Sequence, residues 1–266
     1  MKIKNHLLEG NGVVQKNTPN KGGKIEPKYL IFHYTAGMSA ESSINWLCNK
    51  KAKASAHLVV GRDGNITQLA PFNVKTWHAG KSHWGGLTGL NSHSIGIELD
   101  NAGELFKTGD KYKAWFKKEY LEGEVIRAKH KFKQDFSFWH DYTDIQIERA
   151  LELAELLVEK YNLKDILGHE DIAPGRKIDP GPAFPLENIR SAVLGRAEEE
   201  DELYEVTVSS LNIRRGPGIE YDTVSSPLSR GTKVSLLEMR DRWSKVDVEA
   251  ENDFEGWVYN KYIKRT

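Results

Sequence analysis

The chain has 266 residues, of which 39% are hydrophobic and 29% charged, a composition ordinary for a folded, water-soluble protein and a length sufficient for two domains. Lysine plus arginine and aspartate plus glutamate number 38 each, so the balance of charge gives no reason to expect a nucleic acid partner. One cysteine cannot form an intramolecular disulfide, and no apolar stretch approaches the roughly 18 residues of a membrane span.

The first domain opens with alternating strand and helix signals. The apolar run from Tyr29 to His33 predicts a buried strand, and Ser39 is a suitable N-cap for a helix after it. Two further apolar runs, 56–60 and 66–69, flank the turn dipeptide Asp63-Gly64. Such a combination predicts a β-hairpin.

A strand with two distinct faces is predicted at 94–99, because apolar residues alternate with small or polar ones. One face would carry Ile95, Ile97 and Leu99, and the other Ser94, Gly96 and Glu98.

The longest helix should begin near Thr143, because Thr143 and Gln146 fit a capping box. Its core-facing stripe would comprise Ile147, Ala150, Leu151, Ala154, Val158 and Tyr161. Strands and helices mix, so we assign the first domain to the α/β class. The segment 104–139 is basic and aromatic, and we expect it to be partly helical. It either borders a substrate groove or forms a solvated excursion, and the solvated excursion is the simpler expectation.

A run of five acidic residues, from Glu198 to Glu202, interrupts the chain. Adjacent like charges repel one another, so we predict a linker at 196–203, with a charged helix end as the alternative. This linker would separate a larger domain at 1–195 from a smaller one at 204–266. Short β-like runs at regular spacing predict a small all-β barrel for the second domain. These runs are 204–208, 211–214, 232–238, 243–248 and 256–259.

Three residues of the first domain are candidate metal ligands. His169 and Asp179 stand ten residues apart in a segment rich in proline and glycine, and His33 ends the first predicted strand. Imidazole nitrogen and carboxylate oxygen both bind Zn²⁺ well, and a catalytic zinc site uses three protein ligands with one position open. A lone histidine is more often structural, so the prediction depends on the combination.

Two charged residues could complete a hydrolytic site. Glu98, on the polar side of its strand, is the best candidate for a general base, with a salt bridge at the strand end as the alternative. Lys177 lies two residues before Asp179 and could stabilise an oxyanion, or be a solvated loop lysine.

Two other histidines are candidates for substrate or ligand contacts. Trp77 and His78 precede a glycine turn, where His78 could donate to a substrate carbonyl or orient a metal ligand. His57 lies within an apolar strand and is more often a core histidine with satisfied hydrogen bonds.

Together these residues resemble the zinc-dependent N-acetylmuramoyl-L-alanine amidase type 2 family, which includes the peptidoglycan recognition proteins. The matching motifs follow the family order across 29–185. They are Phe32-His33-Tyr34-Thr35-Ala36-Gly37, Ser55-Ala56-His57-Leu58-Val59-Val60, Arg62-Asp63-Gly64, Trp77-His78-Ala79-Gly80, Asn91-Ser92-His93-Ser94-Ile95-Gly96-Ile97-Glu98 and the segment Gly168 to Phe184.

The resemblance implies a mixed central sheet flanked by helices, with Zn²⁺ held in a groove. It implies that His33, His169 and Asp179 are the metal ligands and that Glu98 and Lys177 are the catalytic pair. Arg176 matches a position expected to contact substrate. Phage lysozyme-type relatives place a catalytic tyrosine where this chain has Ala56, so the resemblance leaves the base role to Glu98.

The second domain resembles bacterial SH3-like domains, which commonly bind cell-wall peptides or glycans. The resemblance is carried by the run Leu211 to Gly218, by 228–234, by Trp243 and by Gly256-Trp257-Val258. These motifs are mostly turn and core chemistry, so they support the fold more than any ligand.

The expected function is therefore hydrolysis of the amide bond between the lactyl group of N-acetylmuramic acid and L-alanine, in peptidoglycan or muropeptides. A non-catalytic peptidoglycan-binding protein is the alternative. The first ten residues lack the apolar segment of a signal peptide, so we expect synthesis in the cytoplasm, with action on the wall only after holin-assisted or dedicated export. A recycling enzyme, an endolysin, an autolysin and a delivered toxin all agree with these features.

Overall fold

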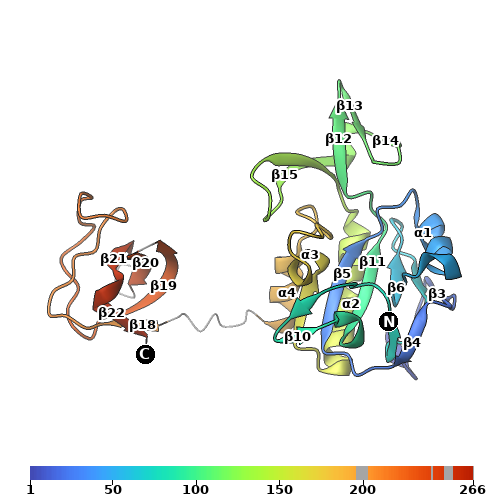
Figure 1. Ribbon diagram of the computed structural model, residues 1–266, viewed down its shortest axis with the longest axis horizontal. Coiled ribbons are helices and arrows are strands. Elements are labelled where there is room, and N and C mark those ends of the chain that lie inside the picture. The colour runs from blue at the N-terminus through green and yellow to red at the C-terminus, as the bar shows by residue number, and fades with distance from the viewer. Residues whose placement is uncertain (196–202, 241, 249–253, 266) are drawn as a thin grey trace. The chain divides into compact units, whose positions relative to one another are not determined.

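The computed structural model describes residues 1–195, 203–240, 242–248 and 254–265, and the chain divides into two compact units, Met1–Gly195 and Arg196–Thr266 (Figure 1). Residues 196–202 of the linker predicted at 196–203, which include the acidic run, lie outside the described residues, whereas Leu203 begins a strand. No helix among the described residues is both long and apolar enough to span a membrane.

The first unit is built on a mixed sheet of six strands, in the spatial order β17-β5-β11-β6-β7-β3. The strands are β3 (Val13–Gln15), β5 (Tyr29–Tyr34), β6 (Leu58–Val60), β7 (Ile66–Gln68), β11 (Ser94–Leu99) and β17 (Asp165–Gly168). The four from β17 to β6 are parallel, β7 is antiparallel to β6, and β3 is parallel to β7. The predicted strand at 29–33 and the predicted hairpin are therefore confirmed.

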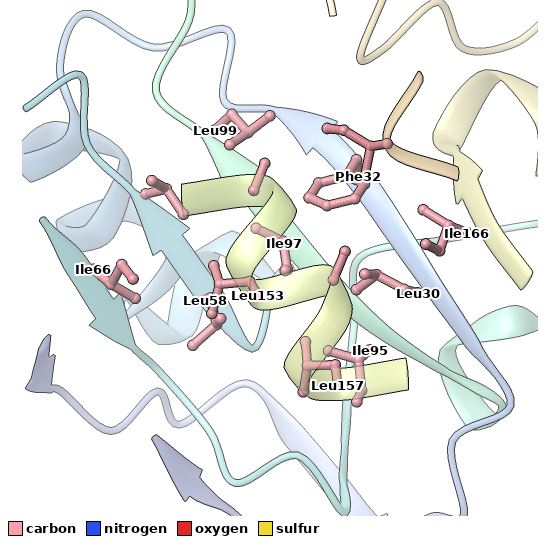
Figure 2. Close-up of a cluster of buried hydrophobic side chains, with 14 of the residues drawn as sticks. Leu30, Phe32, Leu58, Ile66, Ile95, Ile97, Leu99, Leu153, Leu157 and Ile166 are labelled. Carbon is pink, nitrogen blue, oxygen red and sulfur yellow. The ribbon is translucent and has the colours of Figure 1, made fainter. Parts of the chain in front are cut away.

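One face of this sheet is covered by two helices, α2 (Asp144–Tyr161) and α4 (Leu186–Leu194). The predicted capping box starts α2, with the Thr143 side chain accepting from the backbone N–H of Gln146. Figure 2 shows side chains of α2 among those of the sheet. The labelled side chains are Leu30, Phe32, Leu58, Ile66, Ile95, Ile97, Leu99, Leu153, Leu157 and Ile166.

The α2 stripe differs in part from the sequence prediction. Ala150 and Ala154 are fully buried as expected, whereas Leu153 and Leu157, which the predicted stripe omitted, are fully buried as well. The other four predicted positions are partly buried and pack at the margin of the same core. The stripe is therefore wider than the spacing suggested, because α2 lies flat against several strands at once.

The opposite face of the sheet is covered by α1 (Ala40–Leu47), by α3 (His169–Ile172) and by loops. Ser39 caps α1, as predicted. Ile95, Ile97 and Leu99 all point to the α2 side, so the predicted alternation of β11 is confirmed, and Glu98 is left on the α1 and α3 side. Helices on both faces of a mixed sheet establish the α/β class of this unit.

The segment after β11 forms a separate five-stranded sheet, in the order β14-β13-β12-β16-β15, part of which projects away from the central sheet (Figure 1). Its strands are β12 (Glu104–Thr108), β13 (Lys111–Lys113), β14 (Glu119–Tyr120), β15 (Val125–Lys129) and β16 (Phe136–His140). We call residues 104–140 the insert sheet. The expectation of a partly helical insert was wrong, since a three-residue 3-10 turn at Glu122–Glu124 is its helical part. Aromatic residues here pair with charged residues across strands, as Phe106 does with Lys113 and Phe138 with Arg127.

Short elements complete the first unit. They are β1 (Lys2–Lys4), β2 (Leu7–Glu9), β4 (Lys21–Lys24), β8 (Val74–Thr76), β9 (His83–Trp84), β10 (Leu87–Thr88) and 3-10 turns at Lys50–Ala52 and Leu90–Ser92.

The second unit is an antiparallel sheet in the order β21-β20-β19-β18-β22 around its own apolar core. Its elements are β18 (Leu203–Val206), β19 (Lys233–Arg240), β20 (Trp243–Val248), β21 (Phe254–Tyr259), a 3-10 turn at Asn260–Tyr262 and β22 (Ile263–Arg265). The all-β prediction is confirmed. The run at 211–214 forms isolated bridges rather than a strand, and β22 was not predicted.

Candidate metal centre and cleft

Three side chains converge at the carboxyl ends of the parallel strands. Because β17 pairs with β5, with Gly168 opposite Phe32, the residues that follow, His169 and His33, become neighbours. The two Nδ1 atoms lie 2.9 Å apart, and Oδ2 of Asp179 lies 3.1 Å from Nδ1 of His33 and 3.0 Å from Nδ1 of His169. All three residues are buried, with exposures of 1%, 4% and 6% for His33, His169 and Asp179.

The proton on His33 is assigned by a chain of hydrogen bonds. Ser94 Oγ lies 2.6 Å from the carbonyl oxygen of Leu90, which can only accept, so the hydroxyl donates to it. Oγ therefore accepts from Nε2 of His78 at 3.3 Å. Burial is the main cause that lowers the pKa of His78 well below its ordinary value, so this ring is neutral and carries one proton, on Nε2. Its Nδ1 atom must therefore accept a hydrogen bond from Nε2 of His33, which lies 2.9 Å away. Nδ1 of His33 is left with a lone pair.

The same reasoning applies to His169. Its Nε2 lies 3.2 Å from the carbonyl oxygen of Ala79, so the ring proton is on Nε2 and Nδ1 carries a lone pair. Arg176 donates to that carbonyl at 2.9 Å and to the carbonyl of Lys81 at 2.7 Å. Two imidazole lone pairs and a carboxylate oxygen therefore face one another without a proton between them, which a bound cation would balance.

The donor set fits a zinc ion. Nitrogen and carboxylate ligands stand about 2.0–2.1 Å from zinc, so two ligands in a tetrahedral site are about 3.3 Å apart. The three distances here, 2.9, 3.0 and 3.1 Å, are close to that separation. Among the described residues, His33, His169 and Asp179 form a group that could hold a metal ion.

The pKa of His33 agrees with an uncharged imidazole. Burial, followed by the nearby His169, lowers the pKa of His33 to about 4.

Glu98 lies beside this cluster, since β11 pairs with β5 and brings Glu98 opposite His33. Its Oε2 atom is buried and, within the part of the chain that the structure describes, has no hydrogen-bond partner. Burial first, and then the charge of Asp179, raise the pKa of Glu98 well above its ordinary value, while Lys177 opposes them. A carboxyl oxygen without a partner at the edge of a cleft can exchange a proton with a bound molecule.

A cleft of about 810 Å³ opens over the cluster. The predicted residues among its lining are His33, Trp77, His78, Glu98, His169, Arg176, Lys177 and Asp179. Eight of the nine candidate residues are thus brought together in one cavity of a size typical for ligand sites. His78 also contacts the ring of His33, which makes it an orienting residue for that ligand.

His57 is the ninth candidate, and its assignment to substrate binding requires correction. It is fully buried and absent from the cleft lining. Its Nδ1 accepts from the backbone N–H of Gly96 and from Thr76 Oγ1, and its Nε2 donates to the carbonyl of Val74. The alternative reading, a core histidine with satisfied hydrogen bonds, describes it correctly, and burial lowers its pKa to about 4.

Two exposed tryptophans of the cleft were not among the predicted site residues. Trp46 of α1 and Trp115 of the insert sheet both line the cleft and are 56% and 69% exposed. Trp115 Nε1 donates to the carbonyl of Ala36 at 2.9 Å, which ties the insert sheet to the cleft rim. The aromatic composition of 104–139 was the available signal, and at Trp115 the insert borders the groove.

Both units of the chain match known protein families. Residues 23–182 match the family model described as N-acetylmuramoyl-L-alanine amidase, and residues 209–264 match that of the bacterial SH3 domain. N-acetylmuramoyl-L-alanine amidase AmiD of Escherichia coli (strain K12) is 34% identical over 177 residues, covering 63% of this chain and 54% of that protein. The 1,6-anhydro-N-acetylmuramyl-L-alanine amidase AmpD of the same strain is 33% identical over 143 residues, covering 53% and 59%.

A solved structure of AmiD from E. coli, in complex with anhydro-N-acetylmuramic acid-L-Ala-D-gamma-Glu-L-Lys, is 33% identical. It covers 63% of this chain and 58% of that one with a TM-score of 0.46. The chain therefore spans little more than half the length of these relatives. The first family match nevertheless covers 160 of the 266 residues, from 23 to 182. This chain belongs to the N-acetylmuramoyl-L-alanine amidase family and carries a bacterial SH3 domain after the amidase region.

Proposed function

We propose that this protein is a zinc-dependent hydrolase that cleaves the amide bond between the lactyl group of N-acetylmuramic acid and L-alanine, in peptidoglycan or muropeptides. The observation that carries the proposal is the convergence of three lone-pair donors, His33, His169 and Asp179, at the floor of a cleft. Beside them lies the Oε2 atom of Glu98, which has no hydrogen-bond partner in the described part of the chain. Membership of the amidase family supports the choice of bond.

The residues divide the chemistry among themselves. His33, His169 and Asp179 would hold the zinc ion, which when bound would supply a Lewis acid to the cleft. Glu98, whose Oε2 has no hydrogen-bond partner among the described residues, would take a proton from a water molecule and deliver it to the departing alanine nitrogen. Lys177 lines the same cleft, where its ammonium would stabilise the negative charge developing on the carbonyl oxygen.

The cleft lining supports an elongated, partly apolar substrate. Trp46, Trp77 and Trp115 supply aromatic faces on which the apolar side of a sugar ring can lie. Arg176 lines the cleft too, although its guanidinium already binds two backbone carbonyls. We propose that it contacts the substrate while holding the 79–81 segment in place.

The test is mass spectrometry of purified peptidoglycan digested with the zinc-loaded protein, beside Glu98→Gln. Stem peptides with free L-alanine amino termini should be released by the original protein, and the rate should fall by about 10²–10⁴-fold in Glu98→Gln, which keeps the size of the side chain. Intact wall together with retained wall binding would indicate a binding protein instead. New reducing sugar ends would mean that a different bond is cut.

We also propose that the SH3 domain anchors the enzyme to the cell wall, since a small soluble muropeptide requires no such module. Deleting 204–266 should reduce lysis of intact wall while cleavage of a soluble muropeptide persists. Equal loss of both activities would contradict an anchoring role.

A further inference from the structure

We propose that the insert sheet positions the metal ligands, and that it does so through the contact between His130 and Glu170. The inference rests on the proposed metal centre but not on which bond the enzyme cuts. It assigns a role to His130 and Glu170, which belong neither to the ligand set nor to the cleft lining.

The contact joins two buried side chains that are 40 positions apart. His130 Nε2 donates to Oε2 of Glu170 at 2.6 Å, and the exposures of the two residues are 1% and 5%. Nδ1 of His130 accepts from the backbone N–H of Phe132, which assigns the ring proton to Nε2. Lys131 lies 2.9 Å from the other oxygen, Oε1, so both oxygens of the Glu170 carboxylate are occupied by the insert sheet.

Glu170 in turn connects two metal ligands. It follows His169 directly in the chain, and its backbone N–H donates to the carbonyl of Asp179 at 2.8 Å. Fixing the Glu170 side chain therefore fixes the spacing between the His169 and Asp179 segments. Its neighbour Asp171 is held as well, by Lys131 on one side and by the backbone N–H of Gly168 on the other.

The insert sheet also contacts the chain close to the other two candidate ligands, Asp179 and His33. Trp139 stacks on His130, with ring centroids 5.7 Å apart and planes at 21°, and it packs so closely over Gly181 that a Cβ there would lie 2.8 Å from the indole. Gly181 stands two residues after Asp179. On the His33 side, Trp115 donates to Ala36, three residues after that ligand. The segments carrying all three ligands are thus contacted by one sheet.

The physical reason for such a support is the irregular backbone of the ligand loop. Only His33 lies within a strand, whereas α3 has four residues and Asp179 lies in a loop. Metal affinity depends on how well the surrounding contacts hold the ligands, and loss of such a contact typically weakens binding about 10- to 100-fold. Removing His130 would also leave the buried Glu170 carboxylate with an unsatisfied oxygen.

The experiment measures Zn²⁺ affinity of the full chain by competition with a chromophoric chelator, for His130→Leu and His130→Gln. We expect His130→Leu to weaken Zn²⁺ binding about 10- to 100-fold. His130→Gln should restore most of the affinity, because the Gln amide can donate where Nε2 did. Lys111→Met is the matched control, since it removes an exposed ion pair with Glu119 at the distal part of the same sheet and should leave affinity unchanged.

A folded His130→Leu protein with wild-type Zn²⁺ affinity would overturn the inference. If that variant does not fold, Lys131→Met decides the matter, because Lys131 is 39% exposed in its side chain and touches both Glu170 and Asp171. Unchanged affinity in Lys131→Met would then overturn it. If His130→Leu weakens Zn²⁺ binding but the unaltered protein cuts no muramyl amide, only the proposed function is contradicted. If the unaltered protein cleaves the amide strongly but His130→Leu binds Zn²⁺ as tightly as it does, only the inference is contradicted.

Discussion

The two faces of the central sheet use the same strands for opposite purposes. On the α2 side, Phe32 and Ile97 pack in a closed apolar core (Figure 2). On the α3 side, the next residues along the same two strands, His33 and Glu98, lie at the floor of an open cleft. The comparison teaches that the period of two in a strand lets one backbone position a reactive side chain by burying its neighbour.

Among variants that test whether the two faces act independently, His33→Ala should have the largest effect. Zn²⁺ binding and amide cleavage should both be lost, because two ligands cannot replace a three-ligand site. The thermal midpoint of chelator-treated protein should change little. Calorimetry with and without chelator measures the thermal midpoint and the stabilisation by bound zinc, and amide cleavage is assayed separately. Retained stoichiometric zinc would show that His33 is not a ligand.

Leu153→Ala tests the opposite face. Truncating this fully buried side chain should lower the free energy of unfolding by about 2–5 kcal/mol, through lost burial and the cavity left behind. Zn²⁺ affinity of the folded protein should be unaltered, since Leu153 packs on the α2 side of the sheet, opposite the cleft that His33 and Glu98 line. Urea denaturation and chelator competition check the two expectations, and a coupled loss of affinity would mean that the faces are not independent.

Gly96→Ala tests the hydrogen bond between His78 and His33. A Cβ at Gly96 would lie 2.4 Å from Cγ of His78, so the imidazole that accepts from His33 must move. We expect Zn²⁺ affinity to fall about tenfold, the scale typical of losing a hydrogen bond that orients a ligand. Gly23→Ala is the matched control, because a Cβ there meets nothing within 4 Å. Equal affinities in the two variants would show that His78 does not orient the ligand.

Trp115→Ala should give the smallest change. Loss of one aromatic contact is worth about 0.5–1.5 kcal/mol, so KM for a muropeptide should rise about two- to tenfold with kcat nearly constant. Phe106→Ala is the control, because Phe106 is a similarly exposed aromatic residue of the insert sheet that does not line the cleft. Steady-state kinetics of the two variants would contradict the assignment if their KM values changed alike.

The amidase region was largely predictable where local rules act. Alternation in β11 indicated the side of the sheet on which Glu98 lies, and the Thr143 capping box located the start of α2. The candidate metal ligands were chosen from residue type and spacing, and the pairing of β17 with β5 shows how His33 and His169 meet.

What could not be predicted depends on contacts between distant segments. The sequence around His57 does not distinguish a cleft histidine from a core histidine. Its ring forms hydrogen bonds with Thr76 and Val74, which only the folded chain brings near. The strands of the insert sheet pair through aromatic and charged residues without a clear period, so their type was misjudged. The contact between His130 and Glu170 spans 40 positions and leaves no local pattern.

In the proposed enzyme, the convergence of lone pairs described above would make the stability of the amidase region depend on metal supply. The donors of His33, His169 and Asp179 are together only in the folded chain, so a metal ion would bind the native state in preference to the unfolded state. At a free metal concentration 100 times the dissociation constant, this preference would add about 2.7 kcal/mol to the free energy of unfolding. Metal scarcity would therefore limit the lifetime of the enzyme as well as its turnover.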